Sequence, residues 1–372
     1  MDGIYFDNAA TTPLCDAARA ELVDSLDHFA NPSSAHTEGY AESKRLDQSR
    51  RVIASLAGAS PDGVIFTSGG TEADCLALNG GTSRRAPRIV ISDSEHPAVT
   101  RTAEVLARRG YELVRIPTVG GRLDLDALRE AVAGKKTSLV SVMHVNNETG
   151  AIYDVKSASR IVKDADKNAL FHCDCVQSFG KLPFTLSSLG ADMISVSAHK
   201  IGGPKGVGAL ITAPGVRLEP LITGGGQERG IRSGTENTWG IRAFAAAARH
   251  AAEAMETGHA LAVEIRDTLT SLLGEIPGVV FNVPEKFDPH VLSVTLPGVK
   301  SEVAVRMLSD QGLFVSAGSA CSSKLKVSPV LKAFGLSDRD ADRTLRLSFG
   351  EQNTVGEARI AARLIAELAR RF

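Results

Sequence analysis

Two polar side chains stand where predicted strands end, in positions suited to cofactor chemistry. Lys200 follows a strand in "SVSAHKIGGPKG", beside Ser197, His199 and a Gly/Pro loop. A lysine there could form a Schiff base whose phosphate its neighbours hold, or it could be an ordinary solvated residue. Asp174 ends another strand, in "HCDCVQSFGK". A buried carboxylate needs a positive partner, and a pyridinium nitrogen would supply one.

A Gly pair in "FTSGGTEAD" separates a predicted strand from a helix that begins near Thr71. Free backbone N–H groups at a helix start, together with a hydroxyl, can bind a phosphate. A plain capped turn would have the same sequence, so this segment alone does not establish a phosphate site.

Cys321 lies in "SAGSACSS" (316–323), a run of tiny residues. Ser, Gly and Ala offer little apolar surface and little rotamer restriction, so the run predicts a mobile surface loop. The thiol would therefore be within reach of solvent and ligands.

The cysteines argue against a disulfide framework, because five is an odd number in a large chain without a secretory start. His172, Cys173 and Cys175 of "HCDC" could be metal ligands, but the sequence lacks the second ligand pair that makes a zinc site convincing. Period-two alternation instead places the two cysteines on one face of a strand and Asp174 on the other. We expect no metal.

The composition excludes several classes of protein. With 372 residues, 43% apolar and 23% charged, and a net charge of -1, the chain offers no basic field for nucleic acid or an anionic membrane. No segment reads as a secretory leader or is apolar over the length of a membrane span. We expect a cytoplasmic protein that holds anionic ligands locally.

Short runs rich in Val, Ile and Phe alternate with helical segments, which predicts an α/β domain with a mostly parallel sheet. Ligands in such sheets bind beyond the carboxyl ends of the strands. Helices fit around 71–80, 96–109 and 155–167. The predicted strands are 63–68, 88–93, 111–117, 138–145, 169–173, 192–197 and 208–212.

After the Gly-rich segment 224–235 the pattern changes to a smaller α+β unit. It begins with a long Ala-rich helix, continues through the strand "VLSVTLP", and closes with a helix near 354–371. We expect a large domain over 15–250 and a small domain made of 1–14 and 251–372, with a shared interface because no flexible linker separates them.

The chain resembles the group I cysteine desulfurases, enzymes of the nitrogen-fixation and iron–sulfur-cluster assembly type in the class-V aminotransferase family. The resemblance extends from about residue 5 to the C-terminal helix. It implies the pyridoxal 5′-phosphate (PLP) fold type I, aspartate aminotransferase-like, with a seven-stranded, mostly parallel sheet and a smaller α+β C-terminal domain. The motifs that carry it are "DNAATTP", "NPSSAH", "FTSGGTEAD", "EH", "VNNETG", "DCVQSFGK", "SAHKIGGPKG", "GGGQERGIRSGTEN", "SAGSACSS" and "LRLSFG".

The resemblance implies a role for each matching residue. Lys200 would hold the cofactor, Cys321 would be the nucleophile, and His96 would stack on the ring and move protons. A homodimer is implied, because Thr235 would reach the phosphate from the second subunit. The substrate carboxylate would bind Arg346, Asn31 and Asn147, since a guanidinium matches a carboxylate with two parallel hydrogen bonds. The remaining cofactor contacts would be Gly70, Thr71, Asn147, Asp174, Gln177, Ser197 and His199.

The implied reaction removes sulfur from L-cysteine, giving L-alanine and a persulfide on Cys321. A sulfur-acceptor or scaffold protein of iron–sulfur assembly or of tRNA thiolation would then take the sulfur. A selenocysteine lyase, another class-V aminotransferase-type enzyme and a non-catalytic sulfur-transfer scaffold are the alternatives. Two residues depart from the family pattern: Ala317, where serine is common, and Cys175, where Ala or Thr is usual.

Overall fold

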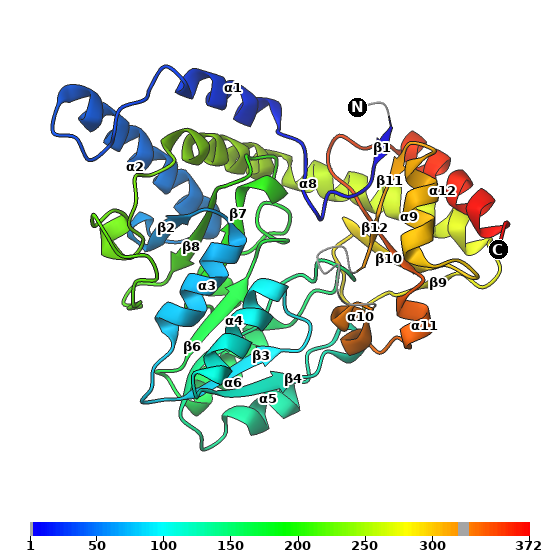
Figure 1. Cartoon of the computed structure of the whole chain (residues 1–372), viewed down its shortest axis with the longest axis horizontal. Helices are drawn as coiled ribbons and strands as arrows, with labels where there is room; N and C mark the ends of the chain where they lie inside the picture. Colours follow the sequence, from blue (N-terminus) through cyan, green and yellow to red (C-terminus); the bar gives the residue numbers. More distant parts are fainter. Residues whose placement is uncertain (1–2, 319–326) are drawn as a thin grey trace.

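The computed structural model describes residues 3–318 and 327–372. Its largest sheet has seven strands in the order β2-β8-β7-β6-β5-β3-β4 (Figure 1). All neighbours are parallel except β8, which runs antiparallel to both β2 and β7. The prediction of a seven-stranded, mostly parallel sheet is confirmed. The strands are β2 (Val64–Thr67), β3 (Arg88–Ser92), β4 (Glu112–Ile116), β5 (Thr137–Ser141), β6 (Leu170–Asp174), β7 (Met193–Ser197) and β8 (Gly208–Thr212).

Each face of this sheet has its own hydrophobic core, because side chains alternate along the strands. In β3, Val90 belongs to one core while Ile89 and Ile91 belong to the other. The helices on the Val90 face are α1 (Asp16–Ser25), α2 (Thr37–Ala57), α5 (Leu125–Val132), α6 (Val155–Ala165), α7 (Leu186–Leu189) and the first part of α8 (Thr238–Gly274). The opposite face is covered by α3 (Gly70–Gly81) and α4 (Pro97–Arg108).

A second unit has a separate core that includes Phe6, Leu292, Leu345 and Ile365. Its antiparallel sheet has the order β12-β13-β10-β9, and β1 pairs in parallel with β11. The strands are β1 (Ile4–Tyr5), β9 (Val280–Phe281), β10 (Val291–Thr295), β11 (Leu313–Phe314), β12 (Ser316–Ala317) and β13 (Thr344–Ser348). The helices are α9 (Ser301–Ser309), α10 (Pro329–Phe334), α11 (Asp338–Ala341) and α12 (Val355–Ala369).

One long helix, α8, connects the two units (Figure 1). Its early residue Phe244 packs in the core of the large sheet, and its later residue Ile265 packs in the core of the second unit. The expected domain boundary at residue 250 falls inside this continuous helix and stays a prediction.

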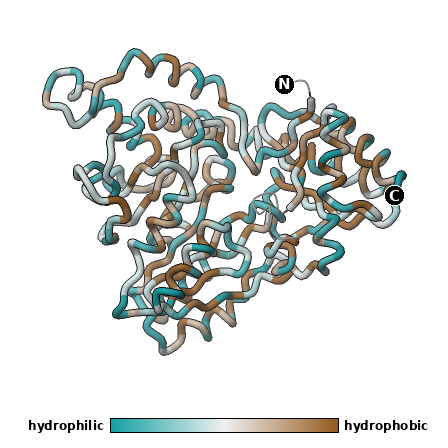
Figure 2. The backbone as a smooth tube through the Cα atoms, in the orientation of Figure 1, coloured by the Kyte–Doolittle hydropathy of each residue, from teal (hydrophilic) through white to brown (hydrophobic). Residues whose placement is uncertain are grey.

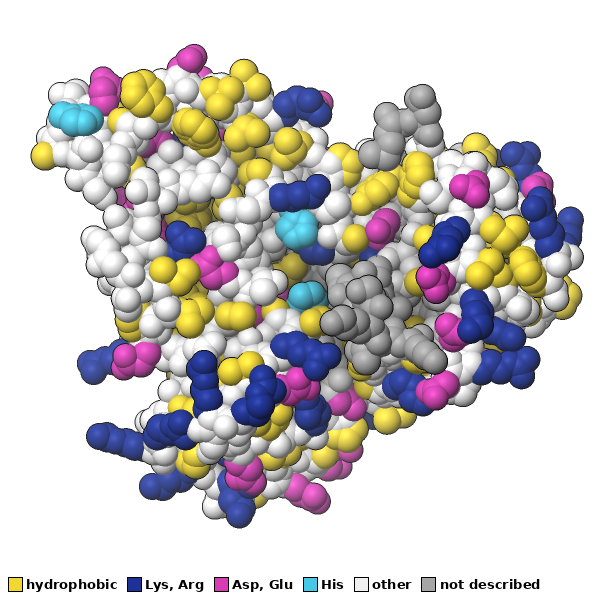
Figure 3. Space-filling view, viewed as in Figure 1, with side chains coloured by type: hydrophobic (Ala, Val, Ile, Leu, Met, Phe, Trp, Pro, Cys, Tyr) yellow, Lys and Arg dark blue, Asp and Glu magenta, His cyan; other side chains and the backbone are white. Residues whose placement is uncertain are grey.

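Hydrophobic stretches lie mainly inside both units, and hydrophilic stretches lie mainly in the outer turns (Figure 2). Within residues 3–318 and 327–372, no helix combines the length and apolar character needed to cross a bilayer. Large apolar side chains are nevertheless exposed over α1, α2 and the turn between them (Figure 3). They include Val23, Leu26, Phe29 and Tyr40, and Phe29 is 82% exposed.

Candidate functional site

Three ionisable side chains meet beyond the carboxyl ends of β3, β6 and β7. Asp174 is the last residue of β6, His96 precedes α4, and Lys200 ends a short 3-10 turn after β7. Burial raises the pKa of Asp174, whereas the charges of His96 and Lys200 lower it. Burial also lowers the pKa of His96, with Asp174 opposing that shift. A buried carboxyl in this position is suited to pairing with a cationic ring nitrogen.

The N-terminal segment orients Lys200 and Gln177. The Lys200 Nζ donates hydrogen bonds to the carbonyl oxygens of Ala9 (2.6 Å) and Ala10 (2.8 Å). Gln177 Nε2 donates to the same Ala9 oxygen at 3.0 Å. The buried Gln177 Oε1 has no hydrogen-bond partner among the described residues. That amide is therefore available to a ligand beside Lys200.

The start of α3 forms a cradle that fits a phosphate. Its N-cap, Gly69, has no side chain to cap the helix, so the backbone N–H groups near Gly70 and Thr71 are not satisfied in that way. The buried hydroxyl of Ser197 has no partner in the part of the chain that the structure describes. A Cβ added to Gly70 would lie 3.6 Å from the Ser197 Cβ, so the two elements are adjacent. An unpartnered buried hydroxyl beside a helix start fits the phosphate of PLP.

His199 adds an imidazole to this edge of the sheet. Its Nδ1 lies 3.1 Å from the Thr11 hydroxyl. Burial, together with the positive charges of Lys200, Lys205 and Lys181, lowers the pKa of His199 to about 4. His199 is therefore neutral at pH 7, in surroundings whose positive charge favours an anion.

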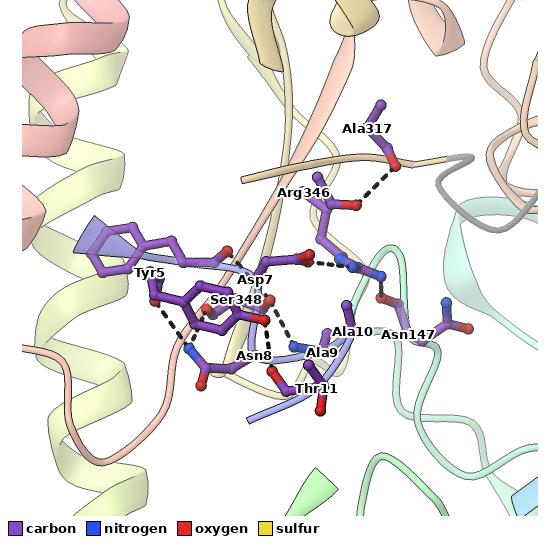
Figure 4. A network of polar contacts seen from close by, with 12 residues as sticks. Tyr5, Asp7, Asn8, Ala9, Ala10, Thr11, Asn147, Ala317, Arg346 and Ser348 are labelled. Carbon is purple, nitrogen blue, oxygen red and sulfur yellow. Dashed lines mark hydrogen bonds and ion pairs between the residues drawn. The ribbon is translucent and has the colours of Figure 1, made fainter. Parts of the chain in front are cut away.

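Arg346 reaches the same region from β13 of the second unit (Figure 4). Arg346 is 5% exposed, and its guanidinium donates from Nη1 to the Asn147 carbonyl at 2.9 Å and from Nη2 to Asp7 Oδ1 at 2.6 Å. The buried Nε has no partner within the described ranges. A substrate carboxylate could therefore bind at Nε, competing with Asp7 for the rest of the guanidinium.

Three predicted site residues lie apart from this group or outside the described chain. Asn31, in the exposed turn between α1 and α2, accepts a hydrogen bond from the Ser33 N–H at 2.9 Å. That turn lies at the far left of Figure 1, away from the second unit. Thr235 is exposed in the segment before α8. Cys321 lies outside the described residues.

Sequence analysis missed a buried polar group on the same face of β6 as Asp174. The ring of His172 lies 2.9 Å from both the Ser141 and the Ser195 hydroxyls. Asp74 Oδ1 is 3.6 Å from His172 Nε2, yet burial lowers the pKa of His172 to about 3 and raises that of Asp74. His172 is therefore neutral at pH 7. The signal that could have identified this group is the spacing of two residues between His172 and Asp174 in "HCD", which places both side chains on one face of the strand.

Glu95 is a second buried acid near Asp174, and sequence analysis gave it no role. Its Oε1 accepts hydrogen bonds from the Ser92 hydroxyl (2.6 Å) and the Met143 N–H (2.8 Å). Burial, together with the negative charge of Asp174, raises the pKa of Glu95 to about 8. At pH 7 Glu95 holds its proton, so Asp174 is the acid of this group that can respond to a cationic ligand.

Cys173 and Cys175 lie in the core of the large sheet, with their sulfurs 3.6 Å apart. This agrees with the expectation that both would lie on one face of the strand. Among residues 3–318 and 327–372, no cluster of three or more His, Cys, Asp or Glu side chains is arranged to hold a metal ion.

Comparisons with known proteins agree with this geometry. The class-V aminotransferase family matches residues 4–359. Cysteine desulfurase IscS of Edwardsiella ictaluri (strain 93-146) is 40% identical over 374 residues, which cover 97% of this chain and 91% of that protein. A solved NifS-like protein has a TM-score of 0.94 at 35% identity, covering 100% of both chains. The structure of SspA in complex with cysteine has a TM-score of 0.81 at 32% identity, covering 93% of this chain and 99% of the other. The chain therefore belongs to the PLP-dependent class-V aminotransferase family and, within it, to the cysteine desulfurases.

Proposed function

We propose that the protein removes sulfur from L-cysteine and releases L-alanine, with the sulfur captured as a persulfide on Cys321. The main support is the buried Asp174 between His96 and Lys200, in a fold whose relatives are cysteine desulfurases. When bound, PLP supplies a cationic ring that draws electrons from the substrate and makes its α-hydrogen acidic.

The residues that hold the cofactor are those that the sequence assigned. Asp174 would provide the negative partner of the ring nitrogen, and Gln177 and Asn147 would hold the phenolic oxygen. His96 is held at the start of α4, where its Nδ1 accepts from the Ala98 N–H at 3.2 Å, and it would stack on the ring. Gly70, Thr71, Ser197 and His199 would bind the phosphate.

Substrate binding and proton transfer fall to residues from both units. Arg346 would bind the substrate carboxylate with Asn147 assisting, and Asn31, which lies apart in the turn between α1 and α2, would assist only across a homodimer interface. Lys200 accepts the α-proton at Nζ, the atom now held by the Ala9 and Ala10 carbonyls. Nζ must leave those carbonyls to act as a base.

The bonds, electrons and protons of the sulfur-transfer step all come from the bound cysteine and from groups in the active site. The Cys321 thiolate attacks the sulfur of the bound cysteine, an S–S bond forms, and the Cβ–S bond breaks. The electron pair left on Cβ takes a proton, for which His96 would be the donor, Lys200 Nζ returns the α-proton to Cα, and L-alanine leaves. No external oxidant is needed. The persulfide then passes to an acceptor protein of iron–sulfur assembly or of tRNA thiolation.

A homodimer would explain why Asn31 and Thr235 are exposed and separate from the other site residues. The apolar side chains over α1 and α2, with Phe29 82% and Val23 65% exposed, support an interface on that face. Thr235 would then reach the phosphate of the partner subunit. A cytoplasmic location is also part of the proposal, supported by the odd number of cysteines.

Alanine release from cysteine with a reductant present tests the proposal. The wild-type protein should release alanine and sulfide, and Cys321→Ser should keep its bound PLP absorbance but lose that release. Equal alanine release by Cys321→Ser would refute the assigned nucleophile. Selenocysteine turnover without cysteine turnover would favour a selenocysteine lyase, and absence of both would favour a non-catalytic scaffold.

A further inference from the structure

Glu148 is a buried carboxylate in contact with both described flanks of the segment that carries Cys321. It lies in the turn between β5 and α6 and is 9% exposed. Its Oε2 accepts a 2.6 Å hydrogen bond from the Ser328 hydroxyl. A Cβ placed on Gly318 would come within 2.9 Å of the same oxygen. One atom of the large unit thus contacts the chain just before and just after residues 319–326.

The turn that carries Glu148 is rigidly held. Asn146, fully buried, accepts hydrogen bonds at Oδ1 from the backbone N–H groups of Glu148 and Thr149, both at 2.9 Å. Its Nδ2 donates to the Ser94 carbonyl at 3.1 Å, two residues before His96. Glu148 is therefore fixed relative to the edge of the sheet that holds His96.

The contact on the other side is equally well ordered. Ser328 is 2% exposed and caps α10, where its Oγ accepts from the Leu331 N–H at 3.3 Å while donating to Glu148. A Cβ on Gly318 would also lie 2.8 Å from Leu331 Cδ1, so this position has no room for a side chain. Glu148, Gly318, Ser328 and Leu331 form one packed junction.

The same junction is connected to the substrate arginine. Ser316 pairs with Arg346 across β12 and β13, and Arg346 donates to the carbonyl of Asn147, the residue before Glu148. The turn that positions Glu148 thus also receives the side chain that would bind the substrate carboxylate. Sulfur transfer requires the Cys321 segment to be held at a defined position relative to the bound substrate, because a small misplacement of the reacting atoms lowers the reaction rate strongly.

We infer that Glu148 is a positioning residue for sulfur transfer, which holds the two described flanks of the Cys321 segment against the turn that receives Arg346. The inference rests on the proposed function, because it concerns the delivery of the Cys321 thiol and not the loading of cofactor or substrate. It assigns to the Glu of "VNNETG" a task that the cofactor contacts do not include.

Single-turnover measurements separate delivery of the thiol from binding of cysteine. Cysteine binding is followed by titrating the PLP absorbance, and persulfide formation is followed by quenched-flow mass spectrometry of the Cys321 peptide. Burial raises the pKa of Glu148 to about 7, so a hydrogen bond to this carboxyl group corresponds to about threefold to about a hundredfold in rate or equilibrium. Glu148→Ala should slow persulfide formation by that factor and leave the half-saturating cysteine concentration within about twofold of wild type.

Two variants test whether the hydrogen bond itself is responsible. Glu148→Gln keeps an oxygen that can accept from Ser328, so it should recover most of the rate. Ser328→Ala should slow persulfide formation like Glu148→Ala, and the double variant should be no slower than the slower single variant. Glu302→Ala, on the exposed face of α9, is the matched control and should behave as wild type.

The outcomes distinguish this inference from the proposed function. A wild-type protein that forms no persulfide refutes the proposed function and, with it, the inference. A wild-type protein that forms persulfide, together with Glu148→Ala at an unchanged rate, refutes the inference alone. Equal losses of cysteine binding and persulfide formation in Glu148→Ala would also refute it, since that result indicates a general structural role.

Discussion

Replacing Glu95 by glutamine should remove a pH-dependent loss of stability that the burial of this carboxyl causes. Glu95 is 3% exposed, and burial raises its pKa from 4.5 to about 8. The folded protein therefore binds a proton that the unfolded chain releases above pH 4.5. Stability from this group is complete below pH 4.5 and is lost as the pH rises toward 8. At ~1.4 kcal/mol per pH unit, the difference between the pKa of Glu95 in the unfolded chain and in the folded protein corresponds to ~5 kcal/mol of folding free energy.

The glutamine variant keeps the carbonyl that accepts from Ser92 and the Met143 N–H, but it has no proton to lose. At pH 5 the thermal unfolding midpoints of wild type and Glu95→Gln should be close. At pH 8.5 the variant should be the more stable by several degrees, since part of ~5 kcal/mol is recovered. Glu302→Gln on the protein surface serves as the control. If the thermal unfolding midpoints of Glu95→Gln and wild type differ by the same amount at pH 5 and at pH 8.5, this account of the buried acid is refuted.

Three further substitutions test the site and its supports. Arg346→Lys should raise the KM for cysteine by about tenfold to about a hundredfold, because lysine cannot make two parallel hydrogen bonds; an unchanged KM would exclude Arg346 from carboxylate binding. Asp174→Asn should lower alanine release by roughly a hundredfold and alter the PLP absorbance, since a buried charge partner worth about 3 kcal/mol is lost; unaltered kinetics would contradict its assigned role. Glu228→Ala should lower the urea unfolding midpoint by an amount equivalent to ~3–5 kcal/mol, because it leaves buried Arg50 without its 2.6 Å partner.

Much of the large sheet could be predicted because its strands are short, buried and regularly interrupted by helices. Asp174, His96 and Lys200 could be expected to meet, since each follows a parallel strand and such strands present their carboxyl ends at one edge. The antiparallel direction of β8 could not be read from "GALIT", because a buried strand has the same composition in either direction.

The contacts between the two units could not be predicted from the sequence. Asp7 and Arg346 are 339 positions apart and form an ion pair at 2.6 Å. Glu148 and Ser328 are 180 positions apart. No periodicity along the chain encodes such pairs, because they depend on how the second unit packs against the first. Local signals identified the strand ends, but they could not show that Arg346 already has a carboxylate neighbour.

Mass spectrometry of the Cys321 peptide after brief exposure to L-cysteine tests the central claim most directly. The proposal predicts one added sulfur atom on that peptide, formed with one equivalent of L-alanine and removed by reductant. A control with alanine in place of cysteine should leave the peptide unchanged. Stoichiometric alanine formation without added sulfur on Cys321 would contradict the proposed function.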